Sequence, residues 1–248
     1  STGEVIISDT TEVNGEIAVM VAVIRYADGN SYSFTTLADA LKFAKAGETV
    51  TLLRDVSASE IIKIEKAITL DGNGKKLTST AGRAINVTGV DGVTIKNLTI
   101  DAKGERAINI IQNATNVTID NVTATSANYT VNVAGSAPNA VVNIKNSTLN
   151  GLCTVNVAAK NANVTVDNST VNCNDNNTTT GESYAALALN KDAIGGSIVA
   201  TDSTINVTAG SDSTKGRNGA ENGTVTINGS TEDVLVIVAV ITYEGSNY

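Results

Sequence analysis

The sequence predicts an all-β protein, a right-handed single-stranded parallel β-helix whose coils are about 22–25 residues long. Two observations support this fold class: a strand pattern that recurs with Asn in the same place, and a composition that suits strands. Hydrophobic residues make up 42% of the 248-residue chain, yet aromatic residues make up only 3%, and there is one proline. Val and Ile, with plentiful Thr, fit a pleated, half-buried surface.

The first repeated pattern consists of two short strands with Asn or Asp between them. Its copies are VTIKNLTI (93–100), VTIDNVTA (117–124), VNIKNSTL (142–149), VTVDNSTV (164–171) and IVATDSTI (198–205). The Asn falls at positions 97, 121, 146 and 168, so successive copies are 24, 25 and 22 residues apart. Short strands repeating at this period, with no helix between them, are typical of a solenoid with one coil per period.

We interpret the central Asn of each copy as a bend that resets the inward and outward alternation. In the first copy Val93 and Ile95 would point inward before Asn97, and Leu98 and Ile100 after it. On stacked coils the bend residues would form a ladder in which each amide bonds its neighbours. The predicted structural ladder is Asn97, Asn121, Asn146 and Asn168, with Asp202 in the fifth copy.

A second, shorter strand type lies between these copies. It reads AINV (84–87), AINI (107–110), TVNV (130–133) and TVNV (154–157), with a weaker copy ALAL at 186–189. Period-two alternation predicts that five pairs point outward on these strands: Ala84/Asn86, Ala107/Asn109, Thr130/Asn132, Thr154/Asn156 and Ala186/Ala188. None of these outward side chains would be titratable.

The chain reads as a single domain with three parts. Residues 1–48 hold N-terminal strands and a capping helix, residues 49–232 form the β-helix, and residues 233–248 form a C-terminal capping strand. Thr36 is the predicted helix N-cap, with Asp39 three residues on, and Gly47 would end the helix. The apolar stripe of this helix, which would cover the open end of the stack, is Leu37, Ala40, Leu41 and Ala44.

Two segments carry a family resemblance. ITLDGNGKKL (68–77), followed by VTIxNxT repeats, resembles the first coils of pectate-lyase-like (pectin lyase-like) right-handed parallel β-helices. SFTTLADALKFAKAGETVTLLRDV (33–56) is similar to the entry element of many bacterial secreted and cell-surface members. The resemblance covers roughly residues 33–230. It implies the fold and a secreted or cell-surface location, but this superfold carries lyases, hydrolases, adhesins and inert modules alike.

Catalytic chemistry on this fold needs a base or paired carboxylates in a cleft. The chain has no histidine, and the predicted outward positions carry no titratable group, so we assign no catalytic or cofactor-binding residue. The sequence favours a non-catalytic secreted or cell-surface module that acts as an adhesin, spacer or binding domain. The alternative is a polysaccharide-active lyase or hydrolase, or a polysaccharide-binding protein. The expected partner is a glycan or a host or cell-surface protein.

One irregular segment, VNCNDNNTTTGESY (171–184), interrupts the period. Alternating oxygen ligands could hold calcium there, against the alternative of a plain solvated loop. The candidate ligands are Asp175, Asn177, Thr179 and Glu182.

A row of alternating charges lies beside the Asn ladder. Its members are Lys96, Asp120, Lys145 and Asp167, next to Thr residues at 99, 123, 148, 170 and 204. We interpret the charges as pairs between neighbouring coils, with a binding surface as the alternative.

Net charge, apolar runs and cysteines bear on possible partners, membrane-spanning helices and disulfides. The formal charge of −8 and a sequence pI of about 4.6 argue against a nucleic-acid partner. No apolar run approaches the roughly 20 residues of a membrane-spanning helix. Cys153 and Cys173 lie about one coil apart, and coil alignment sets Cys173 opposite Gly151, which leaves open whether they form a disulfide.

The two ends of the chain carry similar apolar strands. VAVIRY occupies 21–26 and VAVITY occupies 238–243. Residues 17–24 and 234–241 are apolar on both faces and would need cover on both sides. We therefore expect strand pairing or head-to-tail contact at one or both ends, or a protein that repeats this module in tandem.

Overall fold

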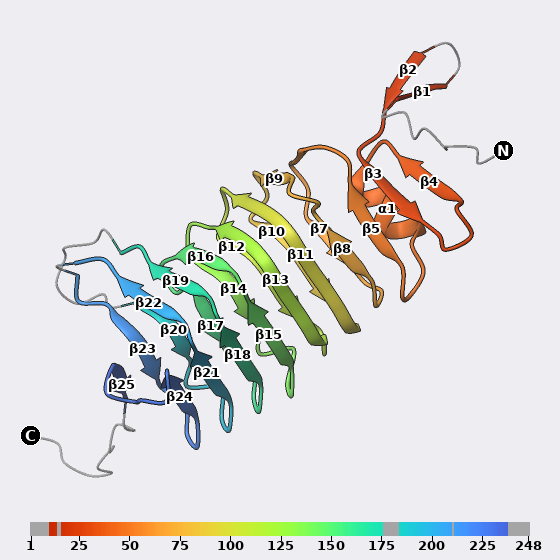
Figure 1. Ribbon diagram of the computed structural model, residues 1–248. Helices are drawn as coiled ribbons and strands as arrows, with labels where there is room; N and C mark the ends of the chain where they lie inside the picture. Colours follow the sequence, from red (N-terminus) through yellow and green to blue (C-terminus); the bar gives the residue numbers. More distant parts are fainter. Residues whose placement is uncertain (1–9, 14–15, 176–183, 210, 238–248) are drawn as a thin grey trace, which may run out of the picture.

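The computed structural model describes residues 10–13, 16–175, 184–209 and 211–237. These residues form a parallel β-solenoid of about seven turns with one short helix near its N-terminal end (Figure 1). The fold class predicted from the sequence is confirmed. No helix in these described ranges is long and apolar enough to cross a membrane.

Each complete coil passes through three columns of parallel strands. The first column contains β5 (Thr49–Leu52), β8 (Thr69–Asp71), β11 (Asp91–Ala102), β13 (Thr115–Thr125), β15 (Val141–Lys145), β18 (Asn163–Asp167), β21 (Ser197–Thr201) and β24 (Thr224–Ile227). The second contains β6 (Val56–Ala58), β9 (Lys76–Ser79), the later halves of β11 and β13, β16 (Thr148–Gly151), β19 (Thr170–Cys173) and β22 (Thr204–Val207). The third contains β7 (Ile62–Ile64), β10 (Arg83–Thr88), β12 (Arg106–Ile111), β14 (Tyr129–Val133), β17 (Val155–Val157), β20 (Ala185–Leu189), β23 (Thr214–Asn218) and β25 (Val234–Val236).

The N-terminal end is closed by antiparallel strands and the helix. β1 (Thr10–Val13) pairs only with β2 (Glu16–Val19) among the described strands, and β3 (Ala22–Arg25) lies between β4 (Ser31–Phe34) and the first coil strand β5. Helix α1 spans Leu37–Phe43. The Thr36 Oγ1 accepts a hydrogen bond from the Asp39 backbone N–H at 3.1 Å, as the capping pattern predicted. The predicted apolar stripe of the helix is buried against the first coil.

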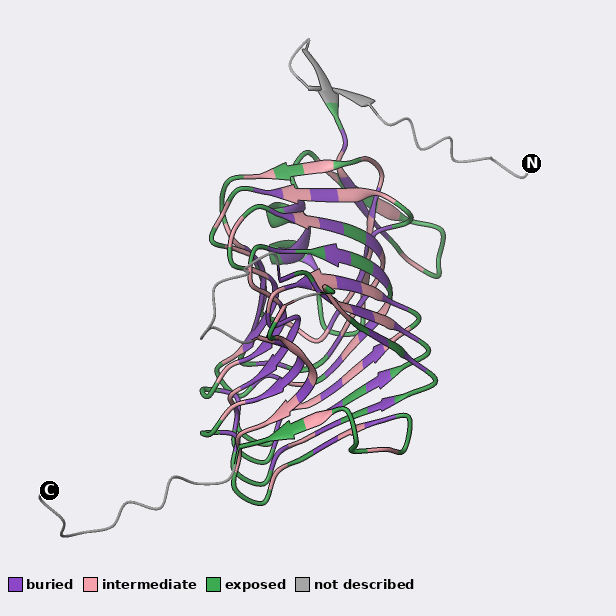
Figure 2. Cartoon of the chain, turned by 90° about the vertical axis from the view of Figure 1, so that its left-hand side faces the viewer, coloured by how far each residue is buried: buried purple, intermediate pink, exposed green. Residues whose placement is uncertain are grey.

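The predicted bend is confirmed in its backbone and in its burial. Asn97 has φ 53°, Asn121 φ 53°, Asn146 φ 51°, Asn168 φ 43° and Asp202 φ 48°. Asn and Asp adopt this left-handed conformation more readily than other residues with a side chain. Val93, Ile95, Leu98 and Ile100 are all buried, so the alternation restarts after Asn97 as expected. The buried strands, purple in Figure 2, line the interior of the stack.

The positions predicted to point outward on the third column are not exposed to solvent. All ten of these residues are buried, with Asn86 the most exposed at 9%. They are small, or their polar groups are bonded: the hydroxyls of Thr130 and Thr154 donate to the carbonyls of Asn150 and Asn172 on the following coil, at 2.5 and 2.7 Å. Such bonds satisfy the hydroxyls and allow their burial.

Within the described residues, the two terminal apolar segments belong to different kinds of strand pair. Residues 17–24 are divided between β2 and β3, and Ala22, Val23 and Ile24 are fully buried. Residues 234–236 form β25, which pairs in parallel with β23. Leu235 is 45% and Val236 56% exposed, so the expected cover on both faces is absent for these two residues. The VAVITY segment itself lies outside the described residues.

Candidate functional site: side-chain ladders and their outer face

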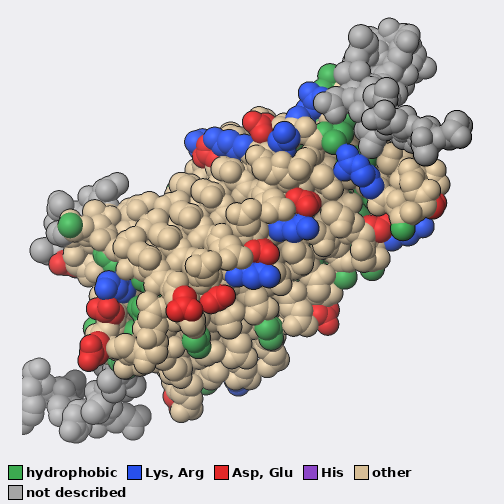
Figure 3. Space-filling model, viewed as in Figure 1, with side chains coloured by type: hydrophobic (Ala, Val, Ile, Leu, Met, Phe, Trp, Pro, Cys, Tyr) green, Lys and Arg blue, Asp and Glu red, His purple; other side chains and the backbone are tan. Residues whose placement is uncertain are grey.

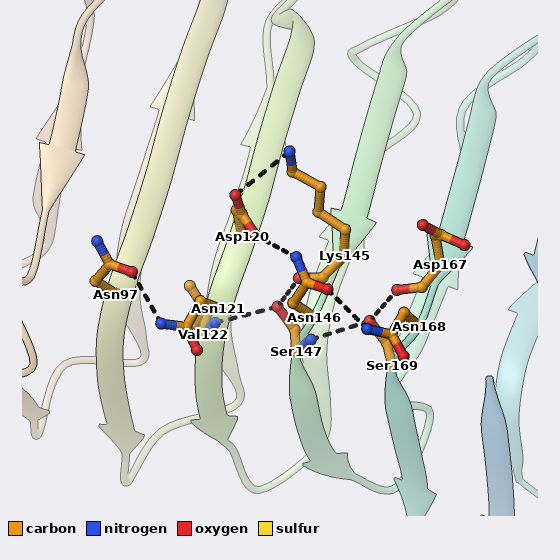
Figure 4. A network of polar contacts seen from close by, with 10 residues as sticks. All are labelled: Asn97, Asp120, Asn121, Val122, Lys145, Asn146, Ser147, Asp167, Asn168 and Ser169. Carbon is orange, nitrogen blue, oxygen red and sulfur yellow. Dashed lines mark hydrogen bonds and ion pairs between the residues drawn. The ribbon is translucent and has the colours of Figure 1, made fainter. Parts of the chain in front are cut away.

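The bend residues form an amide ladder along the outside of the solenoid (Figure 4). Asn121 Nδ2 donates to Asn97 Oδ1 at 2.8 Å, and Asn168 Nδ2 donates to Asn146 Oδ1 at 2.9 Å. Asn146 does not reach Asn121, and its Nδ2 donates instead to Asp120 Oδ1 at 2.8 Å. The ladder therefore consists of two segments, Asn97–Asn121 and Asn146–Asn168, and the Asp120 carboxylate accepts the bond from Asn146 where they meet.

A row of buried serines directly follows the bend. The Ser147 hydroxyl accepts from the Val122 N–H, Ser169 from the Ser147 N–H, and Ser203 from the Ser169 N–H, at 3.0 to 3.1 Å. Ser147, Ser169 and Ser203 also donate to the carbonyls of Lys145, Asp167 and Thr201. This row was not predicted from the sequence, although the recurring triplets KNS, DNS and TDS contain its serines.

A longer amide ladder runs through the third column, where the sequence analysis had expected outward side chains. Asn109 donates to Asn86 at 3.0 Å, Asn132 to Asn109 and Asn156 to Asn132 at 2.7 Å, and Asn190 to Asn156 at 3.0 Å. Asn109, Asn132 and Asn156 are buried. Each amide supplies one donor and one acceptor along the axis of the solenoid, so these buried groups are satisfied in series.

The prediction of ion pairs along the charged row beside the bend is confirmed in part. Lys145 Nζ lies 3.3 Å from Asp120 Oδ2 within the row, whereas Lys96 Nζ lies 3.4 Å from Oδ2 of Asp71, which lies outside it. Asp167 forms no ion pair with any of the described residues. Partial burial alone would raise the pKa of Asp71. Hydrogen bonds from the Asn73 backbone and the Asn97 amide, together with Lys96, outweigh burial and lower this pKa.

A shallow hollow of about 350 Å³ opens on the outer face beside the bend. It is lined by Asn73, Gly74, Asn97, Leu98, Thr99, Asn121 and Thr123. Thr99 pairs in register with Thr123, and the row continues through Thr148 and Thr170 to Thr204. The hollow thus presents amides and hydroxyls and no charged side chain.

Only Asp175 of the four candidate calcium ligands falls among the described residues. It is 1% exposed, and its Oδ2 accepts a hydrogen bond from the Ser213 hydroxyl at 2.6 Å. Asn177, Thr179 and Glu182 lie outside the described residues, so the calcium hypothesis stays a prediction. Within the described part of the chain, no three His, Cys, Asp or Glu residues group as a metal site.

Cys153 and Cys173 are free, buried thiols. Cys173 pairs with Gly151, the alignment expected from the sequence. Burial raises the pKa of Cys153, and burial likewise raises the pKa of Cys173 to about 11. Both side chains are therefore neutral thiols near neutral pH.

Four aromatic residues gather at the N-terminal end. The rings of Tyr26 and Tyr32 are 5.8 Å apart, those of Tyr32 and Phe43 5.2 Å, and those of Phe34 and Phe43 5.2 Å. Tyr32 is 54% and Phe43 46% exposed. Aromatic residues are scarce in the sequence, and their spacing does not predict that β3, β4 and α1 bring them together.

Comparison with protein-family models, with curated proteins and with solved structures finds no match for this chain. A functional proposal therefore rests on the geometry of the ladders and of the faces that they support.

Proposed function

We propose that this chain is a non-catalytic module of a secreted or cell-surface protein that serves as a stiff spacer and presents its outer face for binding. The observation that carries the proposal is the buried amide ladder from Asn86 to Asn190, which bonds coil to coil along the axis. The location outside the cell is supported by the resemblance of residues 33–56 and 68–77 to bacterial surface β-helices.

Axial side-chain bonds bear on stiffness because they resist separation of neighbouring coils. Backbone hydrogen bonds already join each coil to the next, and the Asn97–Asn121, Asn146–Asn168 and serine rows add further links on the opposite columns. A solenoid is a nearly one-dimensional stack in which each coil contacts only its neighbours. Links in the third column and at the bend between the first and second columns therefore oppose the separation of coils at two places around the stack.

Stretching single molecules between handles at the two termini tests the spacer function. We expect the folded solenoid to keep its length under rising force until coils unfold in discrete steps. The Asn132→Ala variant should begin to unfold at lower force. Gradual lengthening of the wild type at low force would contradict the proposal.

A second candidate function, polysaccharide binding, is favoured by the hollow beside the bend. Its lining of Asn97, Asn121, Thr99 and Thr123 offers donors and acceptors without a net charge. Such a surface suits the hydroxyl groups of a neutral sugar. The polysaccharide lyase or hydrolase alternative needs acidic groups that the lining of this hollow lacks.

Glycan-array binding with matched variants tests this second function. The double variant Thr99→Val and Thr123→Val should no longer bind any glycan that the wild-type protein binds on the array. Thr165→Val, on β18, serves as the control and should leave binding unchanged. A lyase assay on acidic polysaccharides, with and without calcium, would reveal activity that contradicts the non-catalytic proposal.

An end-to-end partner is part of the proposal. Large exposed hydrophobic side chains mark both ends of the stack: Val19, Tyr32 and Phe43 at the N-terminal end, and Leu235, Val236 and Ile237 at the other. Contact between such ends of two copies, or of tandem modules, would bury them. Light scattering of the full chain against a version without 232–248 tests this. Identical monomeric mass and stability would refute it.

A further inference from the structure

Two arginines stand side by side on neighbouring coils without an adequate counterion. Arg83 of β10 pairs in register with Arg106 of β12. Neighbouring strands are about 4.8 Å apart, and like charges directly opposite one another destabilise a sheet. The one acidic group within ion-pair distance of Arg106 in the described residues is Glu105, 4.0 Å away and 66% exposed. Arg83 makes no ion pair with any of the described residues.

Each of the two guanidinium groups also has a buried Nε–H donor without an acceptor. Nε of Arg83 and Nε of Arg106 are buried, and neither has a hydrogen-bond partner. In the part of the chain that the structure describes, the third buried side-chain atom without a partner is Asn128 Oδ1, at the same corner of the next coil. A buried N–H without an acceptor destabilises a folded protein, so such a group is expected to bind a ligand or an ordered water.

The surroundings hold one arginine in place and keep the corner basic. The Arg106 guanidinium lies over the Tyr129 ring, 5.4 Å from its centroid, and this cation–π contact favours its position there. Asp101 of the same corner is already paired with Lys76 at 2.8 Å and Lys103 at 2.7 Å. Figure 3 shows several Lys and Arg side chains, with Asp and Glu side chains between them, along the upper edge of the molecule, on the side where Figure 1 places β9.

We propose that Arg83 and Arg106 form a binding site for an oxyanion, a sulfate, phosphate or carboxylate group held between the two guanidinium groups. An oxyanion supplies acceptors for the unpaired N–H groups and a negative charge between two like charges. Guanidinium groups donate in a planar fork that matches carboxylate and phosphate oxygens. The site lies outside the hollow beside the bend and does not depend on the proposed function.

An NMR titration of the arginine Nε–Hε signals tests the site directly. Sodium sulfate, sodium phosphate and sodium acetate are added in separate series at constant ionic strength, with sodium chloride as the reference. We expect the Arg83 and Arg106 signals, assigned from their absence in Arg83→Gln and Arg106→Gln, to shift in a saturable manner with at least one oxyanion. The series that saturates identifies the preferred group.

Variants separate a site from a general effect of salt. Arg83→Gln or Arg106→Gln should weaken oxyanion affinity at least about tenfold. Arg25→Gln, a change at an exposed arginine of β3, should leave it unaltered. Arg106→Lys, which keeps the charge, provides a folded comparison if a Gln variant fails to fold. No saturable shift with any oxyanion, or equal affinity in the Gln and wild-type proteins, would overturn the proposal.

Discussion

At the scale of single residues, the Asn at each bend has two separate roles. Its backbone adopts a left-handed conformation, φ 53° at Asn121, and its amide donates to the neighbouring coil at 2.8 Å. The left-handed conformation disfavours residues with a longer or branched side chain. Glycine adopts this conformation easily but has no amide to donate to the neighbouring coil.

We predict that Asn121→Ala lowers the free energy of unfolding by about 2 kcal/mol, the sum of about 1 kcal/mol each from backbone strain and the lost hydrogen bond. Asn121→Gly should cost less, because glycine accepts the conformation without strain. Denaturant unfolding measures both variants. Equal losses would show that the backbone conformation contributes nothing.

The carboxyl group of Asp71 predicts a pH dependence of stability. Its pKa in the folded protein is lowered, whereas the unfolded value is about 3.9. A lowered pKa adds stability above about pH 3.9, and this contribution is lost as the pH falls through the folded pKa. The wild type should therefore lose more stability than Asp71→Asn between about pH 5 and pH 3, by about 1 kcal/mol or less. Parallel pH profiles in urea unfolding would exclude this role.

At the scale of elements, the capping helix and the first repeated pattern could be read from the sequence, but the third column could not. Thr36, the stripe of α1 and the bend at Asn97 follow local rules of capping and alternation. Alternation alone predicted exposed side chains at Ala84 and Asn86, yet both are buried. The amide of Asn86 bonds that of Asn109, about one coil away, and this contact cannot be inferred from the local pattern. Ser147 likewise depends on a partner that is distant in sequence, Val122 of the preceding coil. The aromatic cluster around Phe43 depends on how β3, β4 and α1 pack together.

The N-cap gives a prediction for the helix. Thr36→Ala removes the acceptor for the Asp39 N–H and should lower the free energy of unfolding by about 1 kcal/mol. Thr36→Ser, which keeps the hydroxyl, is the matched variant and should be nearly neutral. Thermal unfolding of the two variants checks this, and equal midpoints would contradict it.

At the scale of the whole molecule, the charged rows and amide ladders follow from stacking alone. Every coil sets the same position of its repeat against the same position of the next, so one Asn per coil becomes a row. The row is interrupted between Asn121 and Asn146 at the bend and unbroken from Asn86 to Asn190 in the third column. The period made the ladder at Asn97 predictable, and it made the Lys145–Asp120 pairing predictable as well. The function of the outer face was not predictable in this way, because a binding surface depends on a ligand that the repeat does not encode.

Hydrogen exchange of Asn132→Ala, followed peptide by peptide, tests most directly whether the buried ladder holds the stack together. This change leaves the Asn156 donor and the Asn109 acceptor without their partner, at a cost of about 1–3 kcal/mol for each buried group. Since each coil contacts its neighbours, exchange should accelerate in β12, β14 and β17 and remain slow in β3 and β5. Unchanged protection in β12, β14 and β17 would contradict the account, as would an equal acceleration along the whole chain.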